Sequence, residues 1–147
     1  MGFAVRVGAK KPEIGSIQAL KMSLLAAKSI AYTKIGASGV HFAGVMERLG
    51  IAEQMKSRTV LVTTGSAGDV VAKGEAEIGV QQISKLLPVA GIEIVGPLPG
   101  DLQKITVFSA GLYTTAKEPD AAKALVRFLS AETAVPVLRK KGMEEPD

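Results

Sequence analysis

The sequence predicts an α/β fold in which a mostly parallel sheet is flanked by helices, with two further helices at the C-terminal end. Short apolar, β-branched segments alternate with segments whose apolar residues recur every three or four positions. Small, turn-forming residues separate many of these segments. The chain has 147 residues, 47% of them hydrophobic, which is enough for one domain with a substantial core. We therefore expect a single α/β domain over residues 1–147.

The first half of the chain alternates strand and helix patterns. Ser16 is a favourable N-cap for a helix whose apolar residues share one face, and Gly50 suits the position just after a helix end. The predicted order is a strand over 3–7, a helix from Ser16, a strand over 29–32, a helix ending near Leu49, a strand over 59–62 and a short helix ending at Lys73.

The second half continues with shorter elements and ends differently. We expect a strand over 77–81, a short helix over 82–87, a strand over 92–95 and the longest strand of the chain over 104–112. Pro119 suits the first turn of a helix. Ser130 is the expected N-cap of a second C-terminal helix, which runs to Lys141 and is closed by Gly142.

Two turns of small residues stand where a predicted strand gives way to a helix, at 36–39 and at 63–68. A helix start offers unpaired N–H groups and the positive end of the helix dipole, and glycine lets a ligand approach the backbone. The carboxyl ends of parallel strands meet at one edge of a sheet, where ligands gather. Ordinary turn and cap chemistry is the better explanation of either turn taken alone. The pair, with its spacing, predicts a site for a small anion held without charged side chains.

Two glutamines, Gln81 and Gln82, end a strand at the same predicted edge. A neutral amide there can donate hydrogen bonds to an oxyanion or a polar solute. The alternative is that one of them caps the following helix. Asp69 falls in the first turn of its helix, where a carboxylate also favours the dipole.

Catalysis and metal binding have little support in the sequence. The chain has no cysteine and one histidine, His41, with no recognisable metal-ligand spacing. We predict no catalytic residue, no metal, no cofactor and no enzyme activity. A hydrolase using Ser38 or Ser66 with His41 stays as an alternative that requires serine and imidazole to meet in space.

Composition also limits the classes of partner that the chain is expected to bind. Aromatic residues make up 4% of the chain, the net charge of +4 is modest, and the lysines and arginines are scattered, which argues against a nucleic-acid surface. No apolar run reaches the ~20 residues of a membrane span, so we expect no membrane insertion. The N-terminal residues lack the pattern of a secretory signal, which predicts a cytoplasmic protein if this is the native start.

Four segments resemble the molybdate-type substrate-binding proteins of ABC transporters, a branch of the type 2 periplasmic binding proteins. They are 5–12, 36–42, 73–79 and 121–129, and the likeness extends over nearly the whole chain.

The resemblance implies a non-enzymatic protein that binds a small oxyanion or polar solute between two α/β lobes, with an ABC permease as partner and a periplasmic location. Residues from about 8 to 108 would correspond to the second lobe and those from about 117 to 142 to the C-terminal helices, while the first lobe has no counterpart. Gln82 stands where molybdate binders tend to carry a tyrosine. The implied ligand-binding residues are Ala37, Ser38, Gly39, Gly68, Asp69, Val70, Gln81 and Gln82.

The C-terminal helices carry several apolar side chains that need a partner surface, which could be the chain's own sheet or another copy of the chain. We expect a homo-oligomer formed through them. Two other interpretations stay open. The chain could be a cytosolic effector-binding module, since transcription regulators use the same bilobal fold, or a truncated lobe with no ligand of its own.

Overall fold

The structure is a computed structural model of the chain that describes residues 1–144. The chain divides into two compact units, Met1–Ile105 and Thr106–Asp147, and each is described here by itself.

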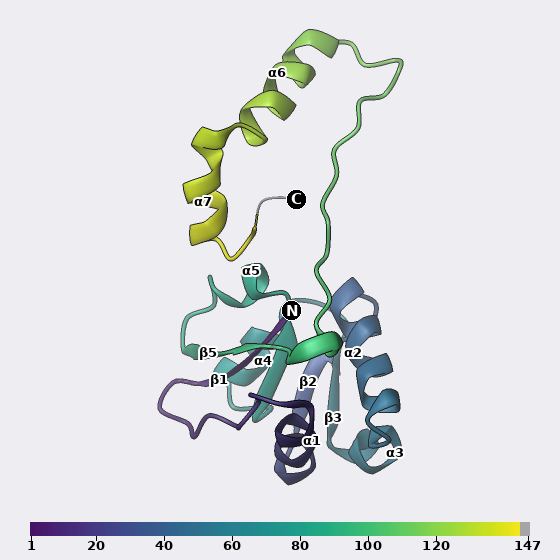
Figure 1. Cartoon of the computed structure of the whole chain (residues 1–147), viewed down its shortest axis with the longest axis vertical. Helices are drawn as coiled ribbons and strands as arrows, with labels where there is room; N and C mark the ends of the chain where they lie inside the picture. The colour runs from purple at the N-terminus through teal and green to yellow at the C-terminus, as the bar shows by residue number, and fades with distance from the viewer. Residues whose placement is uncertain (145–147) are drawn as a thin grey trace. The chain divides into compact units, whose positions relative to one another are not determined.

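The first unit contains a five-stranded mixed sheet with the strand order β3-β2-β4-β1-β5 (Figure 1). β2 pairs in parallel with both β3 and β4, whereas β1 runs antiparallel to its two neighbours, β4 and β5. Four strands therefore share one direction and only β1 opposes them, so the predicted α/β class is confirmed. The strands are β1 (Gly2–Arg6), β2 (Ile30–Thr33), β3 (Thr59–Val62), β4 (Ile78–Gln81) and β5 (Ile92–Pro97).

Helices fill the connections of this unit as the apolar spacing predicts. The Ser16 hydroxyl accepts a hydrogen bond from the Ala19 N–H at 3.1 Å and caps α1. Gly50 has a φ of +67° directly after the end of α2, a conformation that favours glycine. The helices are α1 (Ile17–Ala26), α2 (Ala37–Arg48), α3 (Ala52–Met55), α4 (Ala67–Ala72) and α5 (Ile83–Leu86), with short 3-10 turns η1 (Lys56–Arg58) and η2 (Gly100–Leu102).

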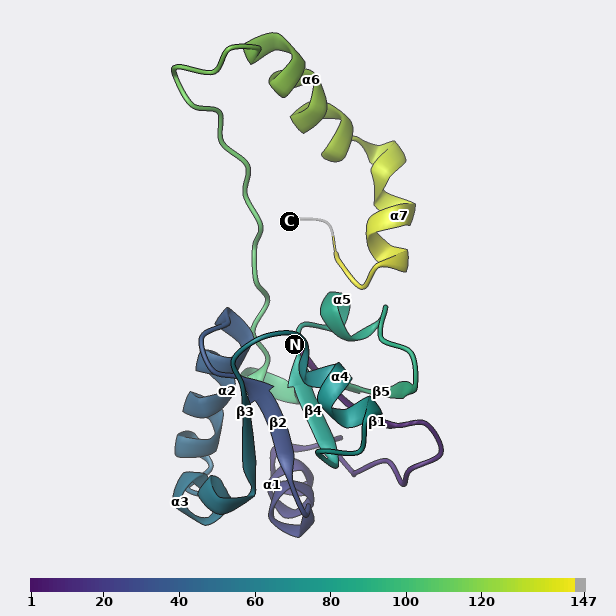
Figure 2. The same cartoon turned by 180° about the vertical axis from the view of Figure 1, so that it is seen from behind.

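Two hydrophobic clusters lie on the two faces of the sheet. Alternate residues of β2 point to opposite faces: Ile30 and Tyr32 join the larger cluster with α1 and α2, and Ala31 joins the smaller one with α4. Figures 1 and 2, which view the chain from opposite sides, show α4 and the α1–α2 pair separated by the sheet. The fold is thus a sheet between two helical layers.

Phe42 anchors α2 to the larger face. Its ring contacts those of Phe3 and Tyr32 edge to face, with centroid separations of 5.9 and 5.4 Å, and its side chain is fully buried. Burial of one such side chain contributes about 1.5–3 kcal/mol. This packing fixes the start of α2 against the end of β2.

The second unit consists of α6 (Pro119–Leu129), η3 (Glu132–Ala134) and α7 (Val135–Lys140). Pro119 occupies the first turn of α6, as predicted. Within residues 1–144, no helix is both long enough and apolar enough to span a bilayer.

Two predictions for this end of the chain are wrong. Residues 104–112 form no strand, because no strand in the described residues pairs with their backbone. Ser130 does not begin a helix: its hydroxyl donates to the Val126 carbonyl at 2.9 Å and it ends α6, while Ala131 precedes η3.

Candidate functional site

The carboxyl ends of β2, β3 and β4 lie at one edge of the sheet. The register pairs Thr33 with Val62 and Tyr32 with Val80, so all three strands stop at nearly the same level. Neighbouring strands are about 4.8 Å apart. The start of α2, the turn over 63–66 and the glutamine pair are therefore neighbours along this edge, as the parallel arrangement predicts.

Hydrogen-bond donors at the start of α2 meet no acceptor in the part of the chain that the structure describes. Gly36 is the N-cap and supplies no side-chain cap. Among residues 1–144, no acceptor meets the N–H groups of Ala37, Ser38 and Gly39, and the Ser38 hydroxyl has no partner although Ser38 is only 4% exposed. The first turn of a helix leaves such groups for water or a ligand.

The glycines of this turn are required by the backbone itself. A Cβ on Gly39 would lie 1.6 Å from the Thr33 carbonyl oxygen, and one on Gly36 would lie 2.6 Å from the Thr33 Oγ1. That Thr33 oxygen is enclosed and has no hydrogen-bond partner in the part of the chain that the structure describes. Gly39 therefore allows α2 to pack closely on the end of β2, whatever it contributes to a ligand.

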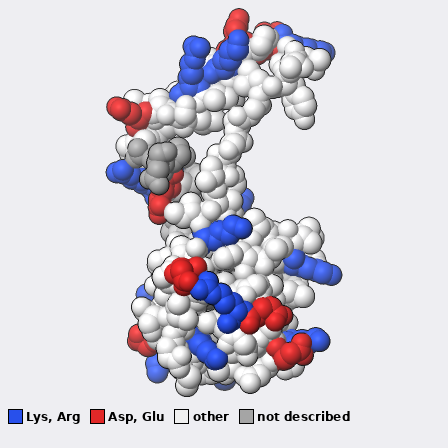
Figure 3. Space-filling view, turned by 45° about the vertical axis from the view of Figure 1, so that its right-hand side comes forward, with Lys and Arg blue, Asp and Glu red and all other residues white. Residues whose placement is uncertain are grey.

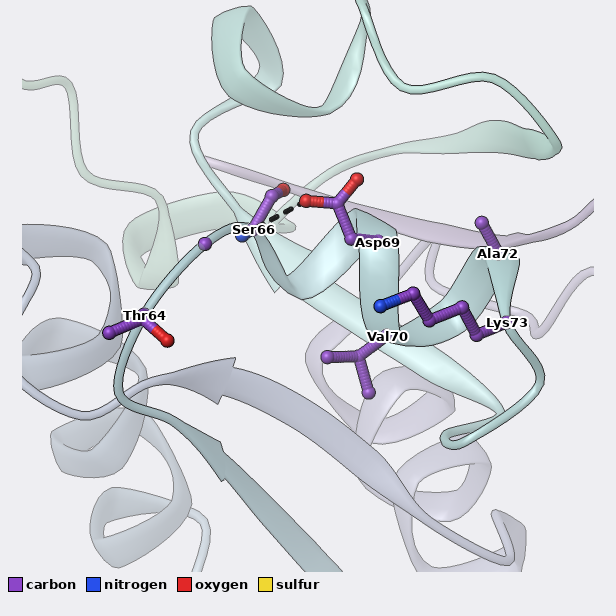
Figure 4. Close-up of a pocket in the computed structure, with 7 residues that line it drawn as sticks. Thr64, Ser66, Asp69, Val70, Ala72 and Lys73 are labelled. Carbon is purple, nitrogen blue, oxygen red and sulfur yellow. Dashed lines mark hydrogen bonds between the residues drawn. The ribbon is translucent and has the colours of Figure 1, made fainter.

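The donors at the start of α4 are paired within the chain. The Ser66 N–H donates to Asp69 Oδ2 at 3.2 Å, as the dashed line in Figure 4 shows, and the Gly68 N–H donates to Ser66 Oγ at 3.1 Å. The Ala67 N–H donates to Gln81 Oε1 at 3.0 Å. Ser66 and Asp69 thus form a capping box.

Gly68 and Val70 face different surroundings. A Cβ on Gly68 would lie 3.0–3.3 Å from side-chain atoms of Ile92, Val89 and Leu86, so this residue faces the packed interior. Val70 is half-buried and borders an open hollow of about 340 Å³ beside α4, into which Lys73 reaches back along the helix (Figure 4). The hollow is lined by Thr64, Gly65, Ser66, Asp69, Val70, Ala72 and Lys73. Contact of Gly68, Asp69 or Val70 with a ligand stays a prediction.

The two glutamines have different roles. Gln81 is 8% exposed, and its Oε1 accepts hydrogen bonds from the Ser66 hydroxyl at 2.8 Å and from the Ala67 N–H. Gln82 holds the N-cap position of α5, but its side chain forms no capping bond. Gln81 therefore caps α4 and not the helix that follows it.

Sequence reasoning left Ser66 out of the ligand-binding set and did not find its bond to Gln81. The spacing of Ser66 and Asp69 is the signal of a capping box, which could have assigned the local bonds of this turn. The bond to Gln81 joins residues 15 positions apart and depends on the sheet.

His41 forms a structural contact between α2 and η2. Its Nε2 lies 2.8 Å from the Leu102 carbonyl oxygen, which can only accept, so this nitrogen carries the proton. About two turns further along α2, Arg48 pairs with Asp101. In the described residues His41 is hydrogen-bonded to neither Ser38 nor Ser66, and residues 1–144 contain no group of three candidate metal ligands.

The surface shows no concentration of one charge on the face that Figure 3 displays, where lysines and arginines alternate with aspartates and glutamates. The donors of the candidate site are themselves neutral groups, namely backbone N–H groups, the Ser38 hydroxyl and the glutamine amides.

Comparison with known proteins assigns the chain to a family. The bacterial extracellular solute-binding protein family matches residues 1–144. This chain belongs to that family. The substrate-binding domain of a molybdenum ABC transporter from Clostridium difficile superimposes with a TM-score of 0.69 over 99% of this chain and 63% of its own, at 16% identity, and shares the fold.

Two curated relatives are named for different activities, one as an isomerase and one as a binding protein. Aconitate isomerase from a Pseudomonas species is 35% identical over 145 residues, 98% of this chain and 55% of its own length. The molybdate-binding protein ModA of Azotobacter vinelandii is 32% identical over 130 residues, 84% of this chain and 50% of its own. The chain therefore spans about half the length of these relatives, and its predicted kinship with molybdate-type binding proteins is confirmed.

Proposed function

We propose that this solute-binding chain holds a small oxyanion or polar solute at the edge formed by the start of α2 and the end of β4, without catalysing a reaction. The observation that carries the proposal is the set of unpaired donors there, at Ala37, Ser38 and Gly39. Gln81 and Gln82 supply further amide donors next to them. In this proposal residues from about 8 to 108 act as one ligand-facing lobe.

The chemistry of the edge favours a ligand rich in acceptors. Backbone N–H and hydroxyl groups donate to oxygen without adding a charge, and the positive end of the α2 dipole favours an anion. Because the donors are neutral, recognition depends on their positions, which the packing of Phe42 and Gly39 holds fixed.

Isothermal titration calorimetry of the purified chain tests the proposal. Molybdate, tungstate, sulfate, phosphate and the cis and trans isomers of aconitate serve as six separate titrants. We expect saturable binding of one of them and a twofold to tenfold loss of affinity in Ser38→Ala, since one hydrogen bond contributes about 0.5–1.5 kcal/mol.

Ser57→Ala is the matched control. Ser57 is exposed and lies in η1, and its hydroxyl forms no hydrogen bond in the described structure, so this change leaves the affinity unaltered. Absence of heat with all six anions contradicts the proposed function. Equal affinities in Ser38→Ala and the unchanged chain contradict the proposed position of the site.

A second function is favoured by one observation, the 35% identity to a protein named aconitate isomerase over nearly all of this chain. Isomerisation of aconitate moves protons, and Asp69 is the carboxylate that lines the hollow beside α4. Proton NMR of cis-aconitate incubated with the chain would report conversion to the trans isomer. Turnover that Asp69→Asn abolishes, with binding retained, would favour the isomerase.

Two partners complete the proposal. An ABC permease would receive the solute, as the molybdate-type kinship implies. A second copy of the chain would cover the apolar side chains of α6, because Leu125, Phe128 and Leu129 are each more than half exposed and their own unit leaves them uncovered.

A further inference from the structure

Gln81 is a buried amide whose two ends are not equivalent in this fold. It lies at the carboxyl end of β4 and is 8% exposed. Its Oε1 receives two hydrogen bonds from the start of α4, one from Ser66 and one from Ala67.

The direction of the amide follows from the donors that face it. The Ala67 N–H can only donate. Ser66 Oγ already accepts from the Gly68 N–H, so its own proton is available for Gln81. Two donors converging on one end of an amide require the oxygen at that end. The Nε2 group must therefore occupy the other end, away from the start of α4.

That Nε2 group has no acceptor among residues 1–144. Thr33 Oγ1 is the one enclosed side-chain N or O atom without a partner in the described residues, so Gln81 Nε2 is open to solvent and can donate to a ligand oxygen there. Gln81 is thus a side chain held in place by a buried, paired oxygen, while its donor end is accessible and without a partner in residues 1–144, at the same edge as the free donors of α2.

We propose that Ser66 is a positioning residue that fixes the orientation of Gln81, so that Gln81 Nε2 donates to the solute and selects ligands that present a carboxylate or another deprotonated oxyanion oxygen. This inference rests on the proposed solute-binding function. It assigns Ser66 an indirect role, distinct from that of Ser38.

The substitution Gln81→Glu tests the donor end of the side chain while leaving an oxygen at the other end. A glutamate keeps an oxygen for Ser66 and Ala67, so α4 stays capped, but it replaces the donor end with an acceptor. We expect a melting temperature within a few degrees of the unchanged chain and at least a tenfold loss of affinity for whichever of the six anions binds. Gln54→Glu, on exposed α3, controls for the added charge and leaves the affinity unchanged.

Ser66 variants test the positioning role. Ser66→Ala removes the hydroxyl and should weaken binding severalfold, whereas Ser66→Thr keeps a hydroxyl and should restore the affinity. In a Ser66→Ala background, Gln81→Glu should cost less than it does alone, because the residues act together. Full affinity in Gln81→Glu, or additive effects of the two changes, would overturn the inference.

NMR of the ligand-free chain decides the orientation whether or not a ligand is found. In the proposed orientation the Gln81 side-chain NH₂ protons point away from the Ala67 amide proton. A strong nuclear Overhauser effect between them would show the opposite orientation and overturn the inference. If none of the anions binds while this effect is absent, the proposed function fails and the orientation of Gln81 stands.

Discussion

At the residue scale, Gly39 is a candidate ligand-binding residue that the packing of α2 on β2 also requires. Its Cα lies so close to the end of β2 that a Cβ would overlap the Thr33 carbonyl oxygen. The position of the α2 donors depends on this approach. A change at Gly39 therefore disturbs the site and the packing together, and Ser38 is the better position for testing ligand binding.

We predict that Gly39→Ala lowers the free energy of unfolding by about 1–3 kcal/mol or more, the usual cost of overpacking. Gly44→Ala is the control in the same helix, where a Cβ meets nothing within 4 Å. That change should raise stability by about 0.5–1 kcal/mol, because alanine favours helix more than glycine. Urea unfolding followed by circular dichroism measures both. Equal stabilities of the two variants would contradict the close approach.

A second residue-scale prediction concerns Glu93, whose carboxylate accepts from Lys11 Nζ at 3.0 Å and from the Gly8 N–H at 3.3 Å. The hydrogen bond from Lys11, then that from Gly8 and the charge of Lys11, hold the pKa of Glu93 below its ordinary value. A lowered pKa in the folded state stabilises the fold above the unfolded pKa, and this contribution is lost as the pH falls through the folded one.

Glu93→Gln should therefore lower the melting temperature at pH 7. The difference in melting temperature from the unchanged chain should become smaller as the pH falls below about 4, near the ordinary pKa of a glutamate. Thermal melts at pH 7 and pH 3 measure the difference. Glu53→Gln is the control, because Glu53 forms an exposed pair with Lys56 at 4.0 Å. A constant difference between Glu93→Gln and the unchanged chain at both pH values would contradict the account.

At the element scale, local signals located most of the elements of the first unit. The Ser16 cap, the apolar spacing of α2 and the strand over 59–62 depend on residues close in sequence, and they appear where the pattern places them. The direction of β1 could not be predicted in this way, because its pattern is the same for either direction and its neighbours β4 and β5 lie more than 70 residues away.

The candidate site likewise combines features that local sequence predicts with contacts that only the folded sheet creates. The α2 start and the glutamine pair were predicted from strand ends and turns. The bonds of Ser66 and Ala67 to Gln81, which occupy the donors of α4, required the three-dimensional sheet. At residues 104–112 the local signal was misleading. Their β-branched composition is typical of a strand, but a strand also needs a neighbouring strand with which to form hydrogen bonds.

The α1 cap yields an element-scale prediction. Ser16→Ala removes the hydroxyl that accepts the Ala19 N–H, so it should lower the free energy of unfolding by about 0.5–2 kcal/mol. Ser57→Ala, at an exposed serine whose hydroxyl forms no hydrogen bond in the described residues, should change the free energy of unfolding by less than about 0.5 kcal/mol. Chemical unfolding of both variants provides the comparison, and equal losses would contradict a specific capping role.

At the scale of the whole molecule, the two units bury their apolar side chains very differently. The sheet of the first unit is covered on both faces by its own helices. In the second unit the structure gives α6 no buried residue, although Leu125 and Leu129 recur at helical spacing. Burial of such a side chain contributes about 1.5–3 kcal/mol, which would offset part of the cost of an association that covers α6.

This difference leads to the prediction that the chain forms a homo-oligomer through α6. Light scattering coupled to size exclusion at micromolar concentration should give a mass at least twice the 15.3 kDa of one chain. Leu125→Lys places a charge in the apolar face of α6 and should shift the mass toward the monomer. Asp120→Asn makes the same change in net charge at an exposed side chain about 140° around the helix from Leu125 and opposite Leu129, so it should leave the mass unchanged. Circular dichroism of both variants verifies that the helix persists, and a monomer for the unchanged chain at high concentration would contradict the proposed assembly.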